Sequence, residues 1–159
     1  MKPLSTSIKK GLSIRPVPAK ETPLDLLLLA DPSEKMINSY LPQADCYVAE
    51  QQRQVVGVCV VKKLSVPTAE IMNIAIRPEN QGEGIGTQLL RYVINQILTE
   101  GIIQIYLGTG SFGYQLTFYQ RLGFRVVAVE RDYFLNNYDK PLFELGVQHK
   151  DRLVLLYER

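Results

Sequence analysis

The chain has 159 residues, of which 46% are apolar and 21% are charged, values typical of a globular protein with one sizeable core. Its net charge of +2, with Lys and Arg scattered along the sequence, argues against a nucleic-acid partner. No run of residues approaches the roughly 18 apolar residues of a membrane helix. Residues 1–10 are mostly polar and lack a secretory signal. We therefore expect one domain over residues 1–159, in the cytoplasm and without membrane contact.

Metal-ligating residues are scarce in this sequence. There are two cysteines and one histidine, whereas a structural zinc site needs about four such ligands. Cys46 and Cys59 do not form a CxxC pair, and disulfides are rare in the cytoplasm. We therefore expect two buried, reduced thiols and no metal.

The chain begins with one predicted strand and two predicted helices. Residues 12–17 alternate like a strand, and the prolines at its end terminate it. Residues 23–30 favour a helix with Pro at its first position and Thr22 as its cap. Residues 32–40 favour a second short helix.

A hairpin is expected next, with strands at residues 47–50 and 55–64 around a turn at residues 51–54. The second strand is apolar on both faces, which is typical of a central strand covered on both sides. The alternation places Val56, Val58 and Val60 on one face and Val55, Cys59 and Val61 on the other.

The second half of the chain alternates between strands and helices. The expected elements are a strand at residues 70–76, a helix at 84–100, a strand at 102–107, a helix at 112–122 and strands at 124–131 and 153–157. Gly101 is a natural end for the long helix, and Ser111 is a candidate cap for the next one. Residues 132–150 are irregular and rich in Tyr, Phe and Asn, so we expect them to carry function or a further strand. The pattern favours an α/β or α+β fold.

Three glycines precede the long helix, in the segment QGEGIGT at residues 81–87. Glycines leave their backbone N–H groups open to a ligand, because they have no Cβ. The first turn of a helix also has unpaired N–H donors and a partial positive charge. The segment therefore predicts an anion site, with phosphate as the usual ligand.

Familiar glycine-rich motifs of different kinds fit this segment less well. A P-loop requires Lys before the final Ser or Thr, but Thr87 directly follows Gly86. A dinucleotide fingerprint requires a third glycine where Thr87 stands, and it should open the first βα unit. A plain tight turn explains neither the alternate spacing nor the position before an amphipathic helix.

The spacing Gln/Arg-x-x-Gly-x-Gly/Ala is filled by Gln81, Gly84 and Gly86. With EIMNIAIRP at residues 70–78 and FYQRLGF at residues 118–124, this segment resembles the GNAT superfamily of N-acetyltransferases. The resemblance covers residues 55–131, roughly half of the chain.

The resemblance implies a mixed, mostly antiparallel twisted sheet of about six to seven strands with about four helices. It also implies that acetyl-coenzyme A enters between two strands that splay apart, here residues 70–76 and 102–107. The pantetheine arm would pair with the strand, and the pyrophosphate would bind the N–H groups of residues 81–87. The residues expected to contact acetyl-coenzyme A are Ile74, Ala75, Ile76, Gln81, Gly82, Glu83, Gly84, Ile85, Gly86, Thr87, Thr109, Ser111 and Phe118.

Two residues match the catalytic positions of relatives. Glu70 stands where the histone-acetylating branch has its base, and it would share a strand face with Met72 and Ile74 if no bulge intervenes. Tyr119 matches the family tyrosine that protonates the leaving thiolate. A solvent-exposed Glu70, with another base or ordered water in its place, and a purely structural Tyr119 are the alternatives. Backbone N–H groups of Ala75 or Ile76 are candidates to polarise the thioester.

The sequence departs from the family after residue 107. Many relatives carry an Asn there that binds the pantetheine, whereas this chain has Thr109 and Ser111, whose hydroxyls are the available substitutes.

The acceptor is an amine that the resemblance does not identify further. Acidic residues Asp132, Asp139 and Glu144 lie among aromatic residues of the late segment, which suits a cation. We expect an N-acetyltransferase; the alternative is an acyl-coenzyme A sensor or partner domain without turnover. The sequence leaves both a monomer and a homodimer open.

Overall fold

A mixed sheet of seven strands forms the centre of the molecule, in a computed structural model that describes residues 9–159. The strands lie in the order β1-β2-β3-β4-β5-β9-β6. Their bounds are Leu12–Val17 (β1), Asp45–Gln51 (β2), Gln54–Lys63 (β3), Thr68–Ile76 (β4), Gln104–Gly110 (β5), Arg125–Glu130 (β6) and Arg152–Glu158 (β9). All neighbours are antiparallel except β4 and β5. The expected fold class is therefore confirmed.

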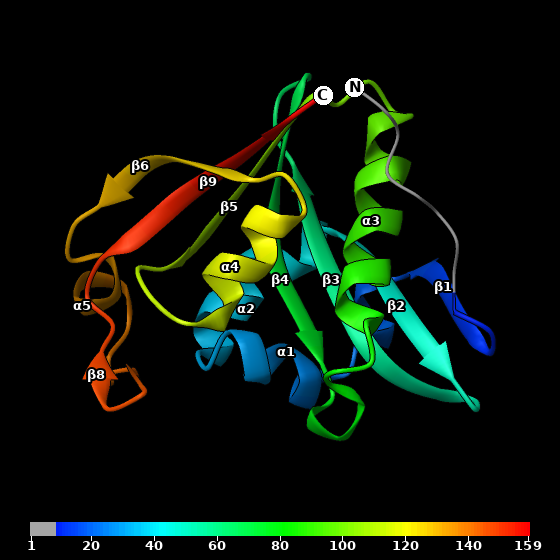
Figure 1. Cartoon of the computed structure of the whole chain (residues 1–159), viewed down its shortest axis with the longest axis horizontal. Helices are drawn as coiled ribbons and strands as arrows, with labels where there is room; N and C mark the ends of the chain where they lie inside the picture. Colours follow the sequence, from blue (N-terminus) through cyan, green and yellow to red (C-terminus); the bar gives the residue numbers. More distant parts are fainter. Residues whose placement is uncertain (1–8) are drawn as a thin grey trace.

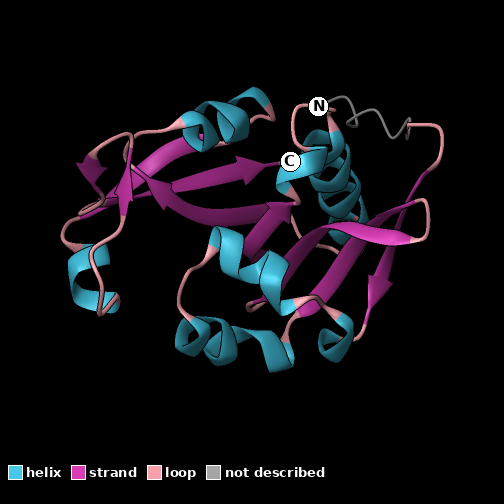
Figure 2. Ribbon diagram, turned by 90° about the horizontal axis from the view of Figure 1, so that it is seen from below, coloured by secondary structure: helices cyan, strands magenta, loops and turns pink. Residues whose placement is uncertain are grey.

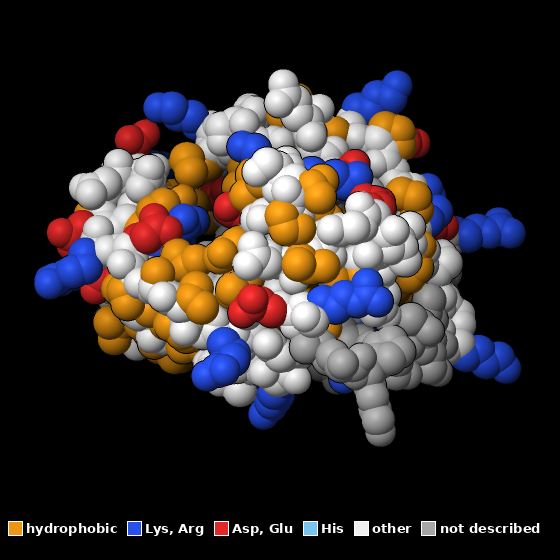
Figure 3. Space-filling model, turned by 90° about the horizontal axis from the view of Figure 1, so that it is seen from above, with side chains coloured by type: hydrophobic (Ala, Val, Ile, Leu, Met, Phe, Trp, Pro, Cys, Tyr) orange, Lys and Arg blue, Asp and Glu red, His pale blue; other side chains and the backbone are white. Residues whose placement is uncertain are grey.

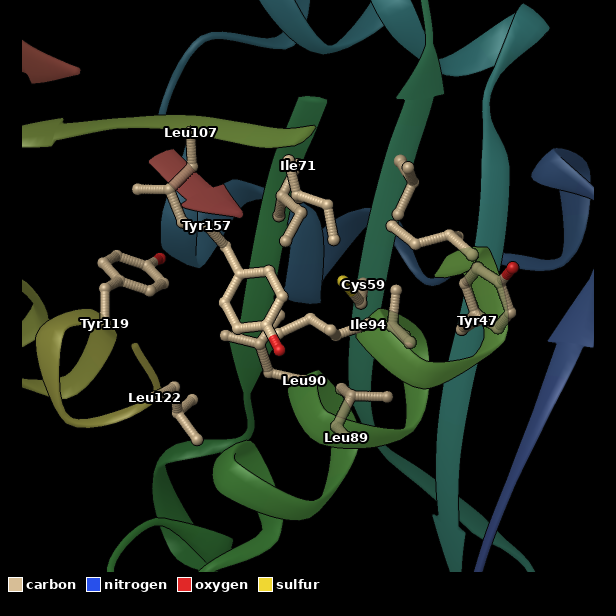
Figure 4. Close-up of a cluster of buried hydrophobic side chains, with 14 of the residues drawn as sticks. Tyr47, Cys59, Ile71, Leu89, Leu90, Ile94, Leu107, Tyr119, Leu122 and Tyr157 are labelled. Atoms are coloured by element: carbon tan, nitrogen blue, oxygen red, sulfur yellow. The ribbon is translucent and has the colours of Figure 1, made fainter. Parts of the chain in front are cut away.

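Helices cover both faces of this sheet (Figures 1 and 2). They are α1 (Leu24–Ala30), α2 (Glu34–Tyr40), α3 (Ile85–Leu98), α4 (Tyr114–Arg121) and the short α5 (Tyr133–Asn137). Helix α3 packs its apolar side on one face of the sheet, together with α4, whereas α1 and α2 pack on the other face. Figure 4 shows side chains of α3 and α4 meeting those of the sheet in the larger core.

The parallel pair β4–β5 separates partway along its length. The two strands pair only from Thr68 and Gln104 to Ile71 and Leu107. Beyond these residues β4 continues to Ile76 along β3, while β5 continues along β9. One edge of the C-terminal part of β4 is therefore free of strand pairing, as expected for a fold whose two strands splay apart.

Two β-bulges change which residues share a face. The register between β2 and β3 shifts at Ala49/Glu50, so Val56 is an extra residue and packs with Cys59 and Val61, not with Val58. Val55 and Val56 therefore each lie on the face of β3 opposite to the expected one. The register between β3 and β4 shifts at Val60/Val61, which makes Met72 the extra residue of β4.

Two predicted helix caps are wrong. The hydroxyl of Thr22 donates to the carbonyl of Ala19, and Pro23 is the residue that precedes α1. Helix α4 starts after Gly113, whose φ of 106° turns the chain into the helix, so Ser111 lies outside it. By contrast, Ser33 caps α2 by accepting the N–H of Met36.

The irregular segment predicted at residues 132–150 contains α5 and a small hairpin of β7 (Phe143–Glu144) and β8 (Val147–Gln148). In residues 9–159 no helix has the length and apolar character needed to cross a bilayer. On the face shown in Figure 3, Lys and Arg side chains are scattered among acidic ones. Cys46 and Cys59 are buried and free, as expected.

Candidate functional site

The free edge of β4 offers backbone groups at Ile74 and Ile76. The N–H of Arg77 donates to the carbonyl of Val56. Since bonding to a neighbour alternates along an antiparallel strand, Ala75 directs its N–H and C=O toward β3. Ile74 and Ile76 direct their backbone N–H and C=O groups to the opposite edge of β4, where β5 no longer pairs with it. Of the three residues expected to contact the pantetheine arm, Ala75 thus directs its backbone groups to β3, whereas those of Ile74 and Ile76 face away from it.

Directly after β4, the glycine segment leads into α3. Gly82 and Gly84 both have a φ of 80°, and a Cβ built on either would meet no protein atom within 4 Å. The first intrahelical bond runs from the N–H of Gln88 to the carbonyl of Gly84. The N–H groups of residues 85–87 therefore have no partner within the helix, and they form the positive end of its dipole.

Side chains brace this loop on the strand. The Gln81 amide donates to the carbonyl of Ile76 at 3.0 Å. Arg77 donates to the carbonyl of Val55 at 2.8 Å and to Asp25 at 2.7 Å, which joins the end of β4 to β3 and α1. The glycine loop is thus held in place while its amides stay open.

A cavity of about 340 Å³ joins these groups. Most of the site residues predicted from the sequence line this cavity. They are Ile74, Ala75, Ile76, Gln81, Gly82, Gly84, Ile85, Gly86, Thr87, Phe118 and Tyr119. Three residues that the sequence predicted as cofactor contacts do not line this cavity. The Glu83 side chain pairs with Lys9 at 3.8 Å, Ser111 is exposed, and Thr109 is buried away from the cavity. We call this space the cofactor cavity.

Sequence reasoning missed other residues of the cofactor cavity, namely Leu29, Ala30, Asn80, Tyr114, Gln115 and Arg121. Two of them could have been found, because Tyr114 and Arg121 lie four residues before and three residues after the predicted Phe118, on the same side of the helix. Arg121 brings a positive charge, and within the described part of the chain it forms no salt bridge.

A second cavity of about 500 Å³ is lined by residues of both β4 and β5. Glu70, Thr109 and Arg152 line it, with Tyr133, Phe134, Tyr138, Phe143 and Glu144 of the late segment. Asp132 and Asp139, which the sequence also suggested, do not. The residues shared by both cavities are Leu29, Ala30, Ile74, Gln115 and Tyr119. We call this space the acceptor cavity, since it meets the cofactor cavity at these residues.

Tyr119 stands at the junction and also belongs to the core. It is 8% exposed and lies 6.1 Å from the Phe124 ring, centroid to centroid. Figure 4 shows it projecting from α4 toward Leu107 of β5. Burial raises the pKa of Tyr119 well above its ordinary value, so the phenol stays protonated at neutral pH.

Glu70 lines the acceptor cavity only. Burial raises the pKa of its carboxyl, while the charges of Arg152 and Lys62 oppose the shift. A carboxylate whose pKa is raised is a better proton acceptor. The bulge at Met72 places Glu70 and Ile74 on opposite faces of β4, so the expected shared face is wrong.

Nothing in residues 9–159 gathers three or more His, Cys, Asp or Glu side chains around a possible metal position. The cavities instead offer open amides, the two arginines Arg121 and Arg152, the buried phenol of Tyr119 and the carboxylates of Asp31, Glu70 and Glu144.

Residues 42–126 match the family described as the acetyltransferase (GNAT) domain. The chain is 42% identical over 134 residues to the uncharacterized N-acetyltransferase YvbK of Bacillus subtilis, covering 84% of this chain and 86% of the relative. It also resembles a solved structure named IAA acetyltransferase from Bacillus cereus, with a TM-score of 0.89, 38% identity and coverage of 93% and 99%.

A GNAT family acetyltransferase from Elizabethkingia anophelis, solved with acetyl-coenzyme A bound, has a TM-score of 0.89 and 36% identity, with 95% of this chain and 100% of that chain covered. A Bacillus subtilis acetyltransferase in complex with coenzyme A has a TM-score of 0.86 and 38% identity, with coverage of 93% and 99%. The glycine loop, the separated strands and these matches agree: the chain belongs to the GNAT family of acetyltransferases.

Proposed function

We propose that this protein transfers the acetyl group of acetyl-coenzyme A to a primary amine, by direct attack within a ternary complex. The observation that carries the proposal is the junction of the two cavities at Ile74 and Tyr119. A thioester held from one side and an amine held from the other would meet there.

The cofactor cavity fits the parts of coenzyme A. Open amides at the start of α3 suit the pyrophosphate, and Arg121 adds charge for it. The free edge of β4 at Ile74 and Ile76 suits the amide-bearing pantetheine arm, which would pair like an added strand. The relatives solved with coenzyme A or acetyl-coenzyme A bound support this assignment.

Acyl transfer first requires an uncharged amine. An alkylamine with a pKa of about 10.4 is almost fully protonated at neutral pH, and freeing it costs roughly 4–5 kcal/mol. We assign Glu70 as the base that takes this proton, directly or through water. Its raised pKa suits that role.

The leaving group requires a proton. The leaving thiolate is the conjugate base of a thiol with a pKa of about 8.5. We assign the protonated phenol of Tyr119, at the cavity junction, as the group that protonates it. The outward-directed N–H of Ile74 or Ile76 would polarise the thioester carbonyl. Glu70 would thus act on the amine nitrogen, the backbone N–H on the carbonyl oxygen and Tyr119 on the leaving sulfur.

A thiol-release assay with acetyl-coenzyme A and a panel of amines tests the proposal. We expect amine-dependent release of coenzyme A together with an acetylated product. Tight coenzyme A binding without release for any amine would instead indicate a sensor or partner domain that binds acyl-coenzyme A without turnover.

A further inference from the structure

The acceptor cavity contains a buried carboxylate, Asp31, without a basic partner. Asp31 ends α1 and is only 7% exposed. Its Oδ1 accepts the hydroxyl of Tyr138 at 2.9 Å and the N–H of Ser33 at 3.3 Å, and its Oδ2 accepts the hydroxyl of Tyr40 at 3.2 Å. All these donors are neutral, and across residues 9–159 no salt bridge reaches Asp31.

The direction of these hydrogen bonds shows that Asp31 acts as an acceptor. The side-chain amide of Asn73 donates to the carbonyl of Leu27 at 3.0 Å and to the hydroxyl of Tyr40 at 3.1 Å. Because that hydroxyl accepts from Asn73, its own proton goes to Asp31. Both carboxylate oxygens of Asp31 therefore act as hydrogen-bond acceptors in this network.

A second acceptor lines the same cavity. The side-chain oxygen of Asn73 is buried, and Asn73 is only 4% exposed, yet this oxygen has no hydrogen-bond partner. A buried amide oxygen without a donor is costly, so Asn73 keeps unused hydrogen-bonding capacity beside Asp31. Among the residues that the structure describes, Asp31 thus lacks a cationic partner, and the Asn73 oxygen lacks a hydrogen-bond donor.

The remaining charges leave the cavity negative. Arg152 is bound to Glu130 at 2.6 Å, and its guanidinium stacks on the ring of Tyr133 at 3.8 Å. His149 lies 3.5 Å from Glu144. Asp31 and Glu70 also line the cavity and form no salt bridge with any described residue, and the ring of Tyr138 suits a cation.

We propose that the acceptor is a diamine or polyamine, whose second ammonium group binds at Asp31 while the first reacts at the cavity junction. This inference rests on the proposed acetyl transfer. The reacting nitrogen must lose its charge before it attacks, whereas a buried carboxylate stabilises the charged form of an amine beside it. The group at Asp31 is therefore the one that remains protonated.

Three four-carbon amines test the proposal: putrescine, butylamine and γ-aminobutyrate. We expect kcat/KM for putrescine to exceed that for butylamine by roughly tenfold or more, as a charge-assisted hydrogen bond would give. Asp31→Asn should remove this preference, because KM for putrescine should rise toward that for butylamine. The control Asp139→Asn removes a charge outside the cavity and should keep the preference.

Several outcomes would overturn the inference. Equal rates for putrescine and butylamine would show that no second charge is recognised. A preference for γ-aminobutyrate would mean that Arg152 selects a carboxylate. Equal losses for all three amines in Asp31→Asn would mean that Asp31 handles the reacting amine or the fold. Tyr138→Phe, which removes one bond to Asp31, should reduce the putrescine preference partially.

Binding separates this inference from the proposed reaction. Calorimetry of putrescine with the coenzyme A-bound protein reads the subsite without turnover. If no amine is acetylated but putrescine binding is lost in Asp31→Asn and kept in Asp139→Asn, the subsite stands and the proposed reaction fails. If acetylation occurs but putrescine binds Asp31→Asn and the unsubstituted protein equally, the subsite is wrong.

Discussion

Glu70 and Ile74 lie on opposite faces of β4, although regular alternation would place residues four apart on one face. The bulge at Met72 causes the difference. As a result, Ile74 reaches the cofactor cavity, while Glu70 points only into the acceptor cavity. The bulge therefore places the candidate base on the side from which an amine would enter.

Replacing Glu70 with Gln should lower kcat/KM roughly hundredfold near neutral pH, the range expected for loss of a general base. Because burial raises the pKa of Glu70, its deprotonation falls above the ordinary carboxyl range. The ratio of unsubstituted to Glu70→Gln activity should rise with pH through that pKa, since only the carboxylate accepts a proton. Taking the ratio cancels the titration of the amine itself.

The exposed Glu158, which lines neither cavity, provides the matched control as Glu158→Gln. It should leave the pH profile unchanged. A Glu70→Gln profile that parallels the unsubstituted one at every pH would remove Glu70 from the proton transfer.

Replacing Tyr119 with Phe should reduce kcat by roughly a hundredfold and leave coenzyme A affinity nearly unchanged, because the hydroxyl acts on the leaving thiolate. The buried Tyr47, which lines neither of the two cavities, is the control as Tyr47→Phe. Steady-state kinetics and calorimetric titration with coenzyme A distinguish the effects. Full activity in Tyr119→Phe would leave Tyr119 with a packing role alone.

Gly84→Ala should weaken coenzyme A binding, whereas Gly101→Ala should not. Both glycines have a positive φ, 80° and 87°, and a Cβ at either meets no protein atom within 4 Å. Each substitution should therefore cost about 1 kcal/mol of stability, from backbone strain alone. In the proposed binding mode, only the Cβ at Gly84 would occupy the space of a phosphate. Equal coenzyme A affinity in the two variants would show that the loop does not hold the pyrophosphate.

Arg121→Gln should lower coenzyme A affinity roughly two- to fivefold, as expected for an exposed charge pair. The loss should shrink as salt is added, because salt screens exposed charges. Arg125, an exposed residue of β6 outside the cavity, gives the control Arg125→Gln. A salt-independent loss, or an equal loss in Arg125→Gln, would argue against contact between Arg121 and a phosphate.

Local sequence patterns predicted those parts of the protein that local physics determines. The amphipathic stripe predicted α3, and the apolar strand at residues 55–64 predicted the buried centre of the sheet. The spacing of Gln81, Gly84 and Gly86 predicted a loop of open amides before a helix, which the structure has.

The errors arise where distant parts of the chain decide the outcome. The bulge at Met72 depends on how β4 pairs with β3, and no residue type in the sequence predicts it. The hydrogen bond between Asp31 and Tyr138 joins residues 107 apart in the sequence, so no local pattern predicts it. Thr22 and Ser111 are good cap residues, but the chain turns at Pro23 and Gly113 instead.

We propose that the amides between β4 and α3 hold the pyrophosphate of coenzyme A. The most direct test follows backbone amide NMR signals while coenzyme A, or pantetheine without the diphosphate, is added. We predict that coenzyme A shifts the signals of Gly82, Gly84 and Gly86 as well as Ile74 and Ile76, while pantetheine shifts mainly the last two. Saturation with coenzyme A that leaves the three glycine signals in place would contradict the claim.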